Sequence, residues 1–261
     1  MVYAKKSLGQ NYLVDKNIIK KIVKLKNIHN KNILEIGPGK GALTNEILEN
    51  KPKSLILIEK DNLLFKELKF KYKNNSKITI FNKDILKFDF EKKLKVNSII
   101  FENLPYNISS QILAQFTKVK KWPPKYSALI FMFQKEMAER VIGNFGSSKY
   151  GRLSILRNYR LKILSKFNIS SNCFFPKPKV ESTILHLQPK KNISYRIKNL
   201  ENLEKITSIL FSGKRKMINK NMRKIFNKKQ LKTIKNLDFE ARPSNLKPEK
   251  YYEITEFFEK I

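Results

Sequence analysis

Three glycines spaced Gly-x-Gly-x-Gly follow an apolar segment, in the run Ile36-Gly37-Pro38-Gly39-Lys40-Gly41. Glycine is needed where a ligand comes close to the backbone, because a side chain would block the approach. The spacing differs from the Gly-x-Gly-x-x-Gly of dinucleotide sites. Taken alone, the run predicts a tight strand-to-helix turn, and the residues around it decide whether it also binds a ligand.

Two carboxylates follow the next two apolar segments at equivalent places. Glu59 ends segment 54–59, and Asp84 comes just after segment 77–82. A carboxylate at the end of the second strand can accept hydrogen bonds from both hydroxyls of an adenosine ribose. Asp84 is well placed for the exocyclic amine of an adenine ring. With no phosphate-binding lysine motif at this site, a cationic sulfonium nucleoside fits better than ATP.

The run Asn103-Leu104-Pro105-Tyr106 follows a fourth apolar segment, 98–103. Pro105 disfavours the helical conformation at Leu104 and holds the chain extended. Two fixed acceptors result, the side-chain carbonyl of Asn103 and the main-chain carbonyl of Leu104, beside the ring of Tyr106. Such a group suits an aromatic amine such as N6 of adenine, because the acceptors bind its N–H groups and the ring stacks on the base. A pyramidal nitrogen is then favoured whose lone pair points at a methyl donor, without a metal or a strong base.

The scaffold for these residues is an alternation of β-rich and helical segments. Buried strands are predicted at 31–36, 54–59, 77–82, 98–103 and 127–134, and helices at 42–50, 63–73 and 109–117. This alternation predicts an α/β, Rossmann-like fold with a mostly parallel sheet and helices on both faces. Two further strands, 161–168 and 179–188, should close one sheet edge as antiparallel strands, with an irregular Pro-containing segment, 174–178, between them.

The pattern changes after Pro189, where apolar residues recur at helical spacing and no β-rich run follows. We therefore predict two domains, residues 1–188 with the candidate site and a small all-helical domain of residues 189–261. Segment 213–226 is basic and amphipathic. Three consecutive cations after Gly213 favour phosphate contact over an ordinary solvated helix, namely Lys214, Arg215 and Lys216.

The charge points to a polyanionic partner. Lys and Arg number 55 against 22 Asp and Glu, giving 55 − 22 = +33. A lysine surface this dense raises affinity for nucleic acid whatever its origin. The abundance of Lys, Asn and Ile is also what an AT-rich genome favours through its codons, so the charge alone does not separate RNA binding from codon bias.

Several classes of protein are excluded by composition. A hydrophobic fraction of 41% can fill a core, which excludes a wholly disordered chain. The longest apolar runs are far below the roughly 18 residues of a membrane span. Residues 1–8 contain no apolar signal segment. The single cysteine excludes an intramolecular disulfide and a cysteine-based zinc cluster. We expect a cytoplasmic protein with no bound metal and no membrane partner.

Asn-Leu-Pro-Tyr after a Gly-x-Gly-x-Gly strand resembles the ribosomal RNA adenine N6-dimethyltransferase family (dimethyladenosine transferases) of the bacterial small-subunit type. The similarity covers nearly the whole chain. Residues 5–15, Lys5-Lys6-Ser7-Leu8-Gly9-Gln10-Asn11-Tyr12-Leu13-Val14-Asp15, resemble the family's N-terminal signature, although Phe is commoner at Tyr12. Residues 174–182 resemble its later motif, in which an aromatic residue closes over the target base. Residues 214–216 and 242–246 resemble its C-terminal domain.

The resemblance implies a class I methyltransferase fold with S-adenosylmethionine as the methyl donor. The implied substrate is two adjacent adenosines in a 3′-terminal hairpin loop of small-subunit ribosomal RNA. The implied partner is that RNA or a pre-ribosomal small subunit, and we expect the protein to act as a monomer. Carried over by position, the cofactor contacts are Asn11, Leu13, Gly37, Glu59, Asp84 and Asn103. The contacts to the target adenine are Asn103, Leu104, Pro105, Tyr106, Phe174 and Phe175. Those to RNA phosphates are Lys214, Arg215 and Lys216.

Three other functions compete with this one. The related methyltransferases of large-subunit RNA that confer macrolide resistance rank lower, because the Asn-Leu-Pro-Tyr-Asn run and the long C-terminal domain look more like the small-subunit branch. A non-catalytic RNA-binding assembly factor or mitochondrial transcription factor on the same scaffold is disfavoured by the intact Asn103 and Tyr106. A nicotinamide dehydrogenase is disfavoured by the glycine spacing and by the lack of a candidate hydride-site histidine.

Overall fold

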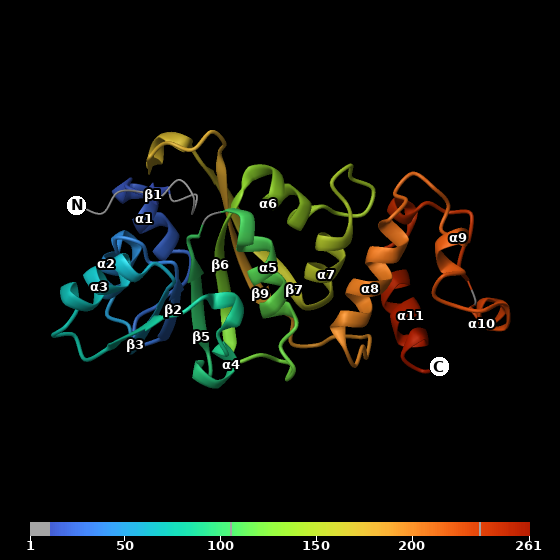
Figure 1. Ribbon diagram of the computed structural model, residues 1–261, viewed down its shortest axis with the longest axis horizontal. Coiled ribbons are helices and arrows are strands. Elements are labelled where there is room, and N and C mark those ends of the chain that lie inside the picture. The colour runs from blue at the N-terminus through green and yellow to red at the C-terminus, as the bar shows by residue number, and fades with distance from the viewer. Residues whose placement is uncertain (1–10, 105, 235) are drawn as a thin grey trace. The chain divides into compact units, whose positions relative to one another are not determined.

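The computed structural model describes residues 11–104, 106–234 and 236–261, without the side chains of Tyr106 and Asn107. Two compact units make up this part of the chain (Figure 1). The first comprises residues up to 115, 119–138 and 162–189. The second comprises residues 116–118, 139–161 and 190–261.

A seven-stranded sheet forms the centre of the first unit, with the strand order β4-β3-β2-β5-β6-β9-β7. Its strands are β2 (Asn32–Ile36), β3 (Ser54–Glu59), β4 (Ile78–Asn82), β5 (Ser98–Glu102), β6 (Tyr126–Gln134), β7 (Leu161–Ile169) and β9 (Ser182–Pro189). The five strands from β4 to β6 pair in parallel, and β9 pairs antiparallel with β6. The predicted mostly parallel sheet with an antiparallel strand toward one edge is confirmed.

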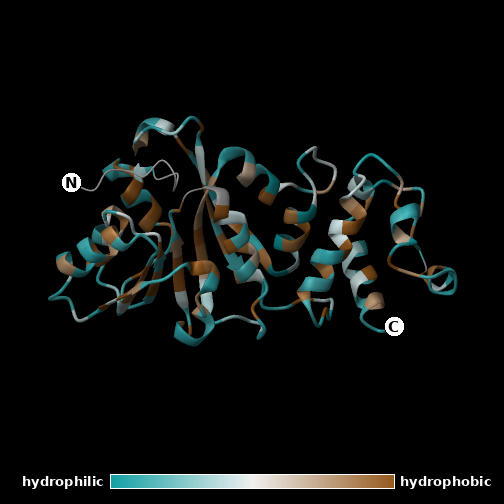
Figure 2. Cartoon of the chain, viewed as in Figure 1, coloured by the Kyte–Doolittle hydropathy of each residue, from teal (hydrophilic) through white to brown (hydrophobic). Residues whose placement is uncertain are grey.

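The sheet is covered on both faces. Successive residues of a strand point to opposite faces, and in β5 and β6 consecutive residues such as Ile99 and Ile100 are equally buried. One face packs against α1 (Lys16–Val23) and α2 (Ala42–Glu49) in a single hydrophobic cluster. Such near-continuous apolar strands are typical of parallel sheets sandwiched between helices, and Figure 2 shows hydrophobic residues concentrated in them.

Four further helices lie in or begin in the first unit. They are α3 (Asn62–Lys71), α4 (Phe90–Lys93), α5 (Tyr106–Thr117) and α6 (Lys135–Ile142). Side chains of Asp15 and Asp61 accept backbone hydrogen bonds at the starts of α1 and α3, so each helix begins where an N-cap residue precedes apolar periodicity. Helices α1, α4 and α6 are additions to the elements predicted from the sequence.

A second, small sheet joins distant parts of the chain. Strand β1 (Tyr12–Leu13) pairs antiparallel with β8 (Phe174–Phe175). The predicted irregular segment 174–178 therefore starts with a short strand. This pairing places Tyr12 and Leu13 of the N-terminal signature beside the start of the later aromatic motif, while residues 5–10 of the signature lie outside the described residues.

Helices build the second unit. They are α7 (Arg152–Arg160), α8 (Leu200–Phe211), α9 (Asn219–Met222), α10 (Lys228–Thr233) and α11 (Pro248–Phe258). Helices α7, α8 and α11 share one hydrophobic cluster, in which Tyr251 stacks on Phe211 at 5.7 Å between ring centroids. No strand occurs among the described residues after Pro189, as the apolar pattern predicts.

Two sequence expectations differ from this arrangement. Residues 139–161, expected in the first domain, pack in the second unit, because Tyr150, Ile155 and Tyr159 are apolar side chains of its core. Segment 213–226 is not one helix. The chain turns at 212–216 and only the four-residue α9 follows, so the three cations lie in a turn, here called the basic turn (residues 214–216).

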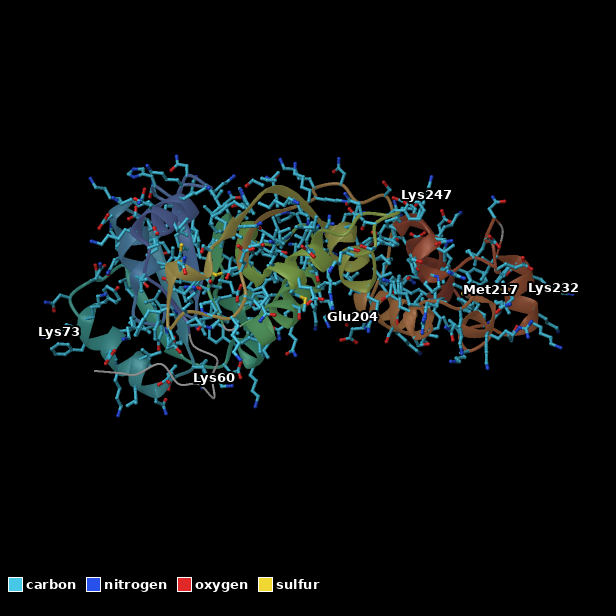
Figure 3. The ribbon with its side chains drawn as sticks, turned by 90° about the horizontal axis from the view of Figure 1, so that it is seen from above. Lys60, Lys73, Glu204, Met217, Lys232 and Lys247 are labelled. Carbon is cyan, nitrogen blue, oxygen red and sulfur yellow. The ribbon has the colours of Figure 1, made fainter. Side chains whose placement is uncertain are left out.

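Cationic side chains are spread over both units. Figure 3 shows lysines such as Lys73 and Lys232 extending away from the ribbon. The positive charge is therefore not confined to the neighbourhood of one site. Among the described residues, no helix is both long and apolar enough to cross a membrane.

Candidate active site

A cavity opens at the carboxyl edge of the parallel strands, within the first unit. Strand pairing places Ile36 beside both Ile58 and Glu102, so the residues that follow β2, β3 and β5 meet at this edge. The cavity and the open solvent at its mouth together occupy about 1240 Å³. In open α/β sheets this edge is where ligands bind.

The glycine loop forms one wall of the cavity. Gly37 has a φ of +69° and Gly39 a φ of +57°, in the left-handed region that side chains disfavour. A Cβ on Gly37 would lie 2.2 Å from Leu104 Cδ2, and one on Gly39 would lie 3.1 Å from the ring of Tyr12. These glycines therefore let the β2–α2 loop touch both strand β1 and the two residues after β5, Asn103 and Leu104, here called the corner.

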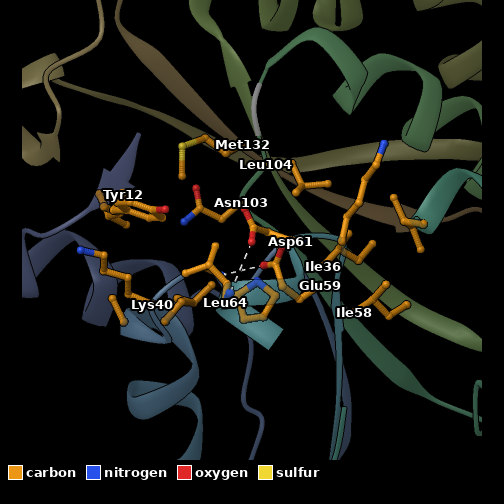
Figure 4. Close-up of a pocket in the computed structure, with 18 of the residues that line it drawn as sticks. Tyr12, Ile36, Lys40, Ile58, Glu59, Asp61, Leu64, Asn103, Leu104 and Met132 are labelled. Atoms are coloured by element: carbon orange, nitrogen blue, oxygen red, sulfur yellow. Dashed lines mark hydrogen bonds between the residues drawn. The ribbon is translucent and has the colours of Figure 1, made fainter. Parts of the chain in front are cut away.

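Glu59 joins the glycine loop to the start of α3. Its Oε2 accepts a hydrogen bond from the Gly39 N–H at 3.2 Å, and its Oε1 accepts one from the Asp61 N–H at 2.8 Å (Figure 4). Only 7% of the residue is exposed. Burial raises the pKa of Glu59, while these backbone hydrogen bonds oppose the rise. Each carboxylate oxygen keeps acceptor capacity for a ligand hydroxyl.

Asp84 also lines the cavity and is more accessible than Glu59. Its Oδ2 pairs with Lys60 Nζ at 2.9 Å, and its Oδ1 accepts a hydrogen bond from the Leu86 N–H at 3.0 Å. The hydrogen bond from Lys60 holds the pKa of Asp84 below its usual value. Asp84 is therefore a carboxylate at neutral pH. Because Lys60 is 67% exposed, its ammonium group can swing away when a ligand amine approaches.

The corner after β5 lines a further side of the cavity. The Asn103 N–H donates to the Ile36 carbonyl at 3.2 Å, which ties the corner to the end of β2. Figure 4 shows the Asn103 amide directed into the pocket, toward the side where Tyr12 and Met132 are drawn. Leu104 also lines the cavity. The predicted acceptors Asn103 and Leu104 therefore stand on the same cavity as the glycine loop.

The paired strands β1 and β8 close the cavity from the other side. Asn11, Leu13 and Phe174 line it, and the last two are almost completely buried. Phe175 points elsewhere, since it is 70% exposed and lies outside the cavity lining. Of the two aromatic residues that begin the later motif, Phe174 and Phe175, only Phe174 lies on the cavity.

The structure brings together all six residues predicted to contact the cofactor, which are Asn11, Leu13, Gly37, Glu59, Asp84 and Asn103. Pro105 lies outside the described residues, as does the side chain of Tyr106, whose backbone begins α5. The basic turn belongs to the second unit, where Lys214 Nζ donates to the Ser148 carbonyl at 3.2 Å.

Sequence reasoning missed several residues of this site. The Tyr12 ring lies against Gly39 and within 5.2 Å of Lys40 Nζ. Met132, from β6, also lines the cavity. Buried Glu102 accepts a hydrogen bond from the Leu104 N–H of the corner itself. An acidic residue ending an otherwise apolar strand is the signal that could have drawn attention to Glu102.

Comparison with known proteins identifies a protein family for nearly the whole chain. The ribosomal RNA adenine dimethylase profile matches residues 1–260. The chain belongs to this family. It is 42% identical to the ribosomal RNA small subunit methyltransferase A of Pelagibacter ubique (strain HTCC1062) over 261 residues, covering all of this chain and 98% of the relative. It is 39% identical to the enzyme of the same name from Malacoplasma penetrans (strain HF-2), covering 95% and 90%.

A solved structure extends the similarity of this adenine dimethylase to three dimensions. The crystal structure of a dimethyladenosine transferase from Plasmodium falciparum superposes with a TM-score of 0.79 at 28% identity, covering 95% of this chain and 97% of that one. The expected class I methyltransferase fold, with its Rossmann-like sheet and C-terminal helices, is thereby confirmed.

Proposed function

We propose that this chain transfers methyl groups from S-adenosylmethionine to N6 of adenosines in small-subunit ribosomal RNA, giving N6,N6-dimethyladenosine. The observation that carries this proposal is that the glycine loop and the Asn103–Leu104 corner line the same cavity. This arrangement supports a nucleoside site next to two acceptors suited to an aromatic amine. The two relatives named above are both small-subunit methyltransferases by name, which supports a small-subunit target over a large-subunit one.

The residues of the cavity suit S-adenosylmethionine. Glu59 would accept hydrogen bonds from the ribose hydroxyls, and Asp84 would accept one from the adenine amine. Ile58 and Ile85 supply apolar walls for the adenine ring. When bound, this cofactor supplies an electrophilic methyl group on a sulfonium centre.

The corner would hold the target amine. The side-chain oxygen of Asn103 and the main-chain oxygen of Leu104 accept its two N–H groups, which directs the nitrogen lone pair toward the methyl group. The chain needs no strong base, because the protonated product amine loses its proton readily to water. Phe174 and Tyr106 are assigned to stacking on the target base. The basic turn is assigned to phosphate contacts.

A methyl-transfer assay tests the proposal. Tritiated S-adenosylmethionine is incubated with the protein and with small or large ribosomal subunits that lack the modification, and digested RNA is analysed for N6,N6-dimethyladenosine. Label in the small subunit alone is expected. An Asn103→Ala variant should lose about a hundredfold in single-turnover rate, as when one preorganised hydrogen-bonding group is removed from an active site. Label in large subunits alone would instead support the macrolide-resistance activity, and no transfer to either would support an RNA-binding role.

A further inference from the structure

Glu102 is a buried carboxyl group to which three separate elements donate hydrogen bonds. Its Oε1 accepts from the Leu104 N–H at 3.2 Å and from the Ser109 hydroxyl at 2.9 Å. Its Oε2 accepts from the Met132 N–H at 3.2 Å. Only 2% of the residue is exposed. The side chain therefore links the corner after β5 to α5 and to β6, without itself lining the cavity.

These bonds fix the peptide group between Asn103 and Leu104. The N–H of that peptide points to Glu102. The carbonyl oxygen of Asn103 lies on the glycine-loop side, 3.3 Å from where a Cβ of Gly37 would stand. The preceding N–H of Asn103 is held by the Ile36 carbonyl. With both flanking peptide groups anchored, the backbone of Asn103 has little freedom to rotate.

We propose that Glu102 is a positioning residue for the transfer reaction: it holds the Asn103–Leu104 corner so that its acceptor oxygens are directed at the target amine. This inference rests on the proposed function of the corner. Reacting groups misplaced by about 1 Å can lose about a hundredfold in rate, so an anchor behind the corner affects chemistry without touching the substrate. The Met132 bond extends the same anchor to another residue that lines the cavity.

Glutamine is an imperfect replacement at this position. Both oxygens of a carboxyl group accept hydrogen bonds, whether or not the group is protonated, whereas a glutamine side chain has one acceptor atom and an NH₂ group that only donates. Two of the three partners are backbone N–H groups that also only donate. Glu102→Gln must therefore lose either the Leu104 bond or the Met132 bond, while keeping the shape of the side chain.

The chain offers a matched control in Glu35, at the neighbouring strand β2. It is equally buried, and its Oε2 accepts a hydrogen bond from the Thr44 hydroxyl at 2.7 Å. Glu35→Gln keeps an acceptor for that hydroxyl. No hydrogen bond in the described part of the chain joins Glu35 to the corner, so the control alters a buried carboxyl group of the same sheet without releasing the corner.

The experiment measures amide exchange and single-turnover transfer on the full chain. In Glu102→Ala, hydrogen exchange at the Leu104 and Met132 amides should accelerate, and transfer should fall about a hundredfold while S-adenosylmethionine affinity measured by calorimetry changes less than about fivefold. Glu102→Gln should lose roughly tenfold, since one backbone bond survives. Glu35→Gln should stay within about threefold of wild type.

The outcomes separate positioning from general stability. If Glu102→Ala does not fold, Glu102→Gln and Ser109→Ala carry the test, the latter removing one hydroxyl donor. Unchanged exchange at Leu104, or a wild-type transfer rate in the glutamine variant, would overturn the proposal. So would an equal loss of cofactor affinity and transfer, because that is the result of a merely structural role. If the wild type transfers no methyl group, the proposed function fails, while amide exchange still tests whether Glu102 anchors the corner.

Discussion

Replacing Gly37 with alanine should disable the site by two effects that the structure separates. The first is conformational: the φ of +69° costs a non-glycine residue about 1–2 kcal/mol. The second is steric. The new Cβ would stand 2.2 Å from Leu104 Cδ2 and 2.8 Å from Leu104 Cγ, against a usual carbon–carbon contact of about 3.5 Å or more. Moving only the end of the leucine side chain does not relieve the Cγ contact, so the corner itself must shift.

The expected shift follows from these distances. The Cδ2 contact is short by about 1.3 Å and the Cγ contact by about 0.7 Å, relative to a normal contact of about 3.5 Å. A displacement of this size at the acceptor corner should lower the single-turnover rate by about a hundredfold. Overpacking should also lower the free energy of unfolding by about 1–3 kcal/mol.

Gly146→Ala is the matched control for Gly37→Ala. Gly146 has a φ of +86°, but a Cβ there would meet no atom within 4 Å. This variant should show the conformational cost alone and transfer methyl groups at the wild-type rate. Rapid-quench transfer, calorimetric cofactor binding and thermal unfolding are measured for both variants. A Gly37→Ala protein that transfers within about threefold of wild type would refute the close approach of loop and corner.

Three other predictions follow from charge and burial. Glu59→Ala should weaken S-adenosylmethionine binding by about 1.5–3 kcal/mol while RNA affinity stays constant, and equal calorimetric affinities would remove Glu59 from the ribose. Burial raises the pKa of both Glu35 and Glu102 to about 8, so between about pH 4.5 and 8 the folded state holds protons that the unfolded state has lost. Thermal stability should therefore fall as pH rises through this window, and it should fall less steeply in Glu35→Gln. An identical slope of stability against pH in the two proteins would contradict these pKa shifts. Changing the basic turn to three alanines should flatten the dependence of log RNA affinity on log salt by up to about 2, with cofactor affinity unchanged, and an unchanged slope would show that the turn does not contact phosphates.

The parts of the site that follow strand ends could be predicted because they depend on local sequence alone. A buried parallel strand delivers its last residue to one edge of the sheet, so Glu59, Asp84 and Asn103 could be placed together once their strands were recognised. The positive φ of Gly37 and Gly39 follows from residue type and turn position in the same way. Asp15 before the apolar pattern of α1 was an N-cap signal of this local kind that the sequence reasoning passed over.

The parts that depend on distant pairing could not be predicted from the residues themselves. Leu13 meets Phe174 through the β1–β8 pairing across most of the chain, and two-residue strands carry no periodicity. The exposure of Phe175 follows from the same pairing, because its neighbour Phe174 takes the inward position. Residues 139–161 join the helical unit through contacts between side chains, which no boundary in composition marks.

The glycine loop and the corner are in direct contact, so a shift of one displaces the other. Leu104 packs where a side chain of Gly37 would be, Asn103 bonds to the end of β2, and Glu102 holds the peptide between them. A ligand that shifts the glycine loop therefore acts on the corner through this direct contact as well as through the end of β2. Because coupling between two binding events is reciprocal, whatever affinity the cofactor adds for the target adenosine, the adenosine adds equally for the cofactor. Glu102 and Gly37 stand on opposite sides of the same peptide group, so changes at either residue should reduce this coupling as well as the rate.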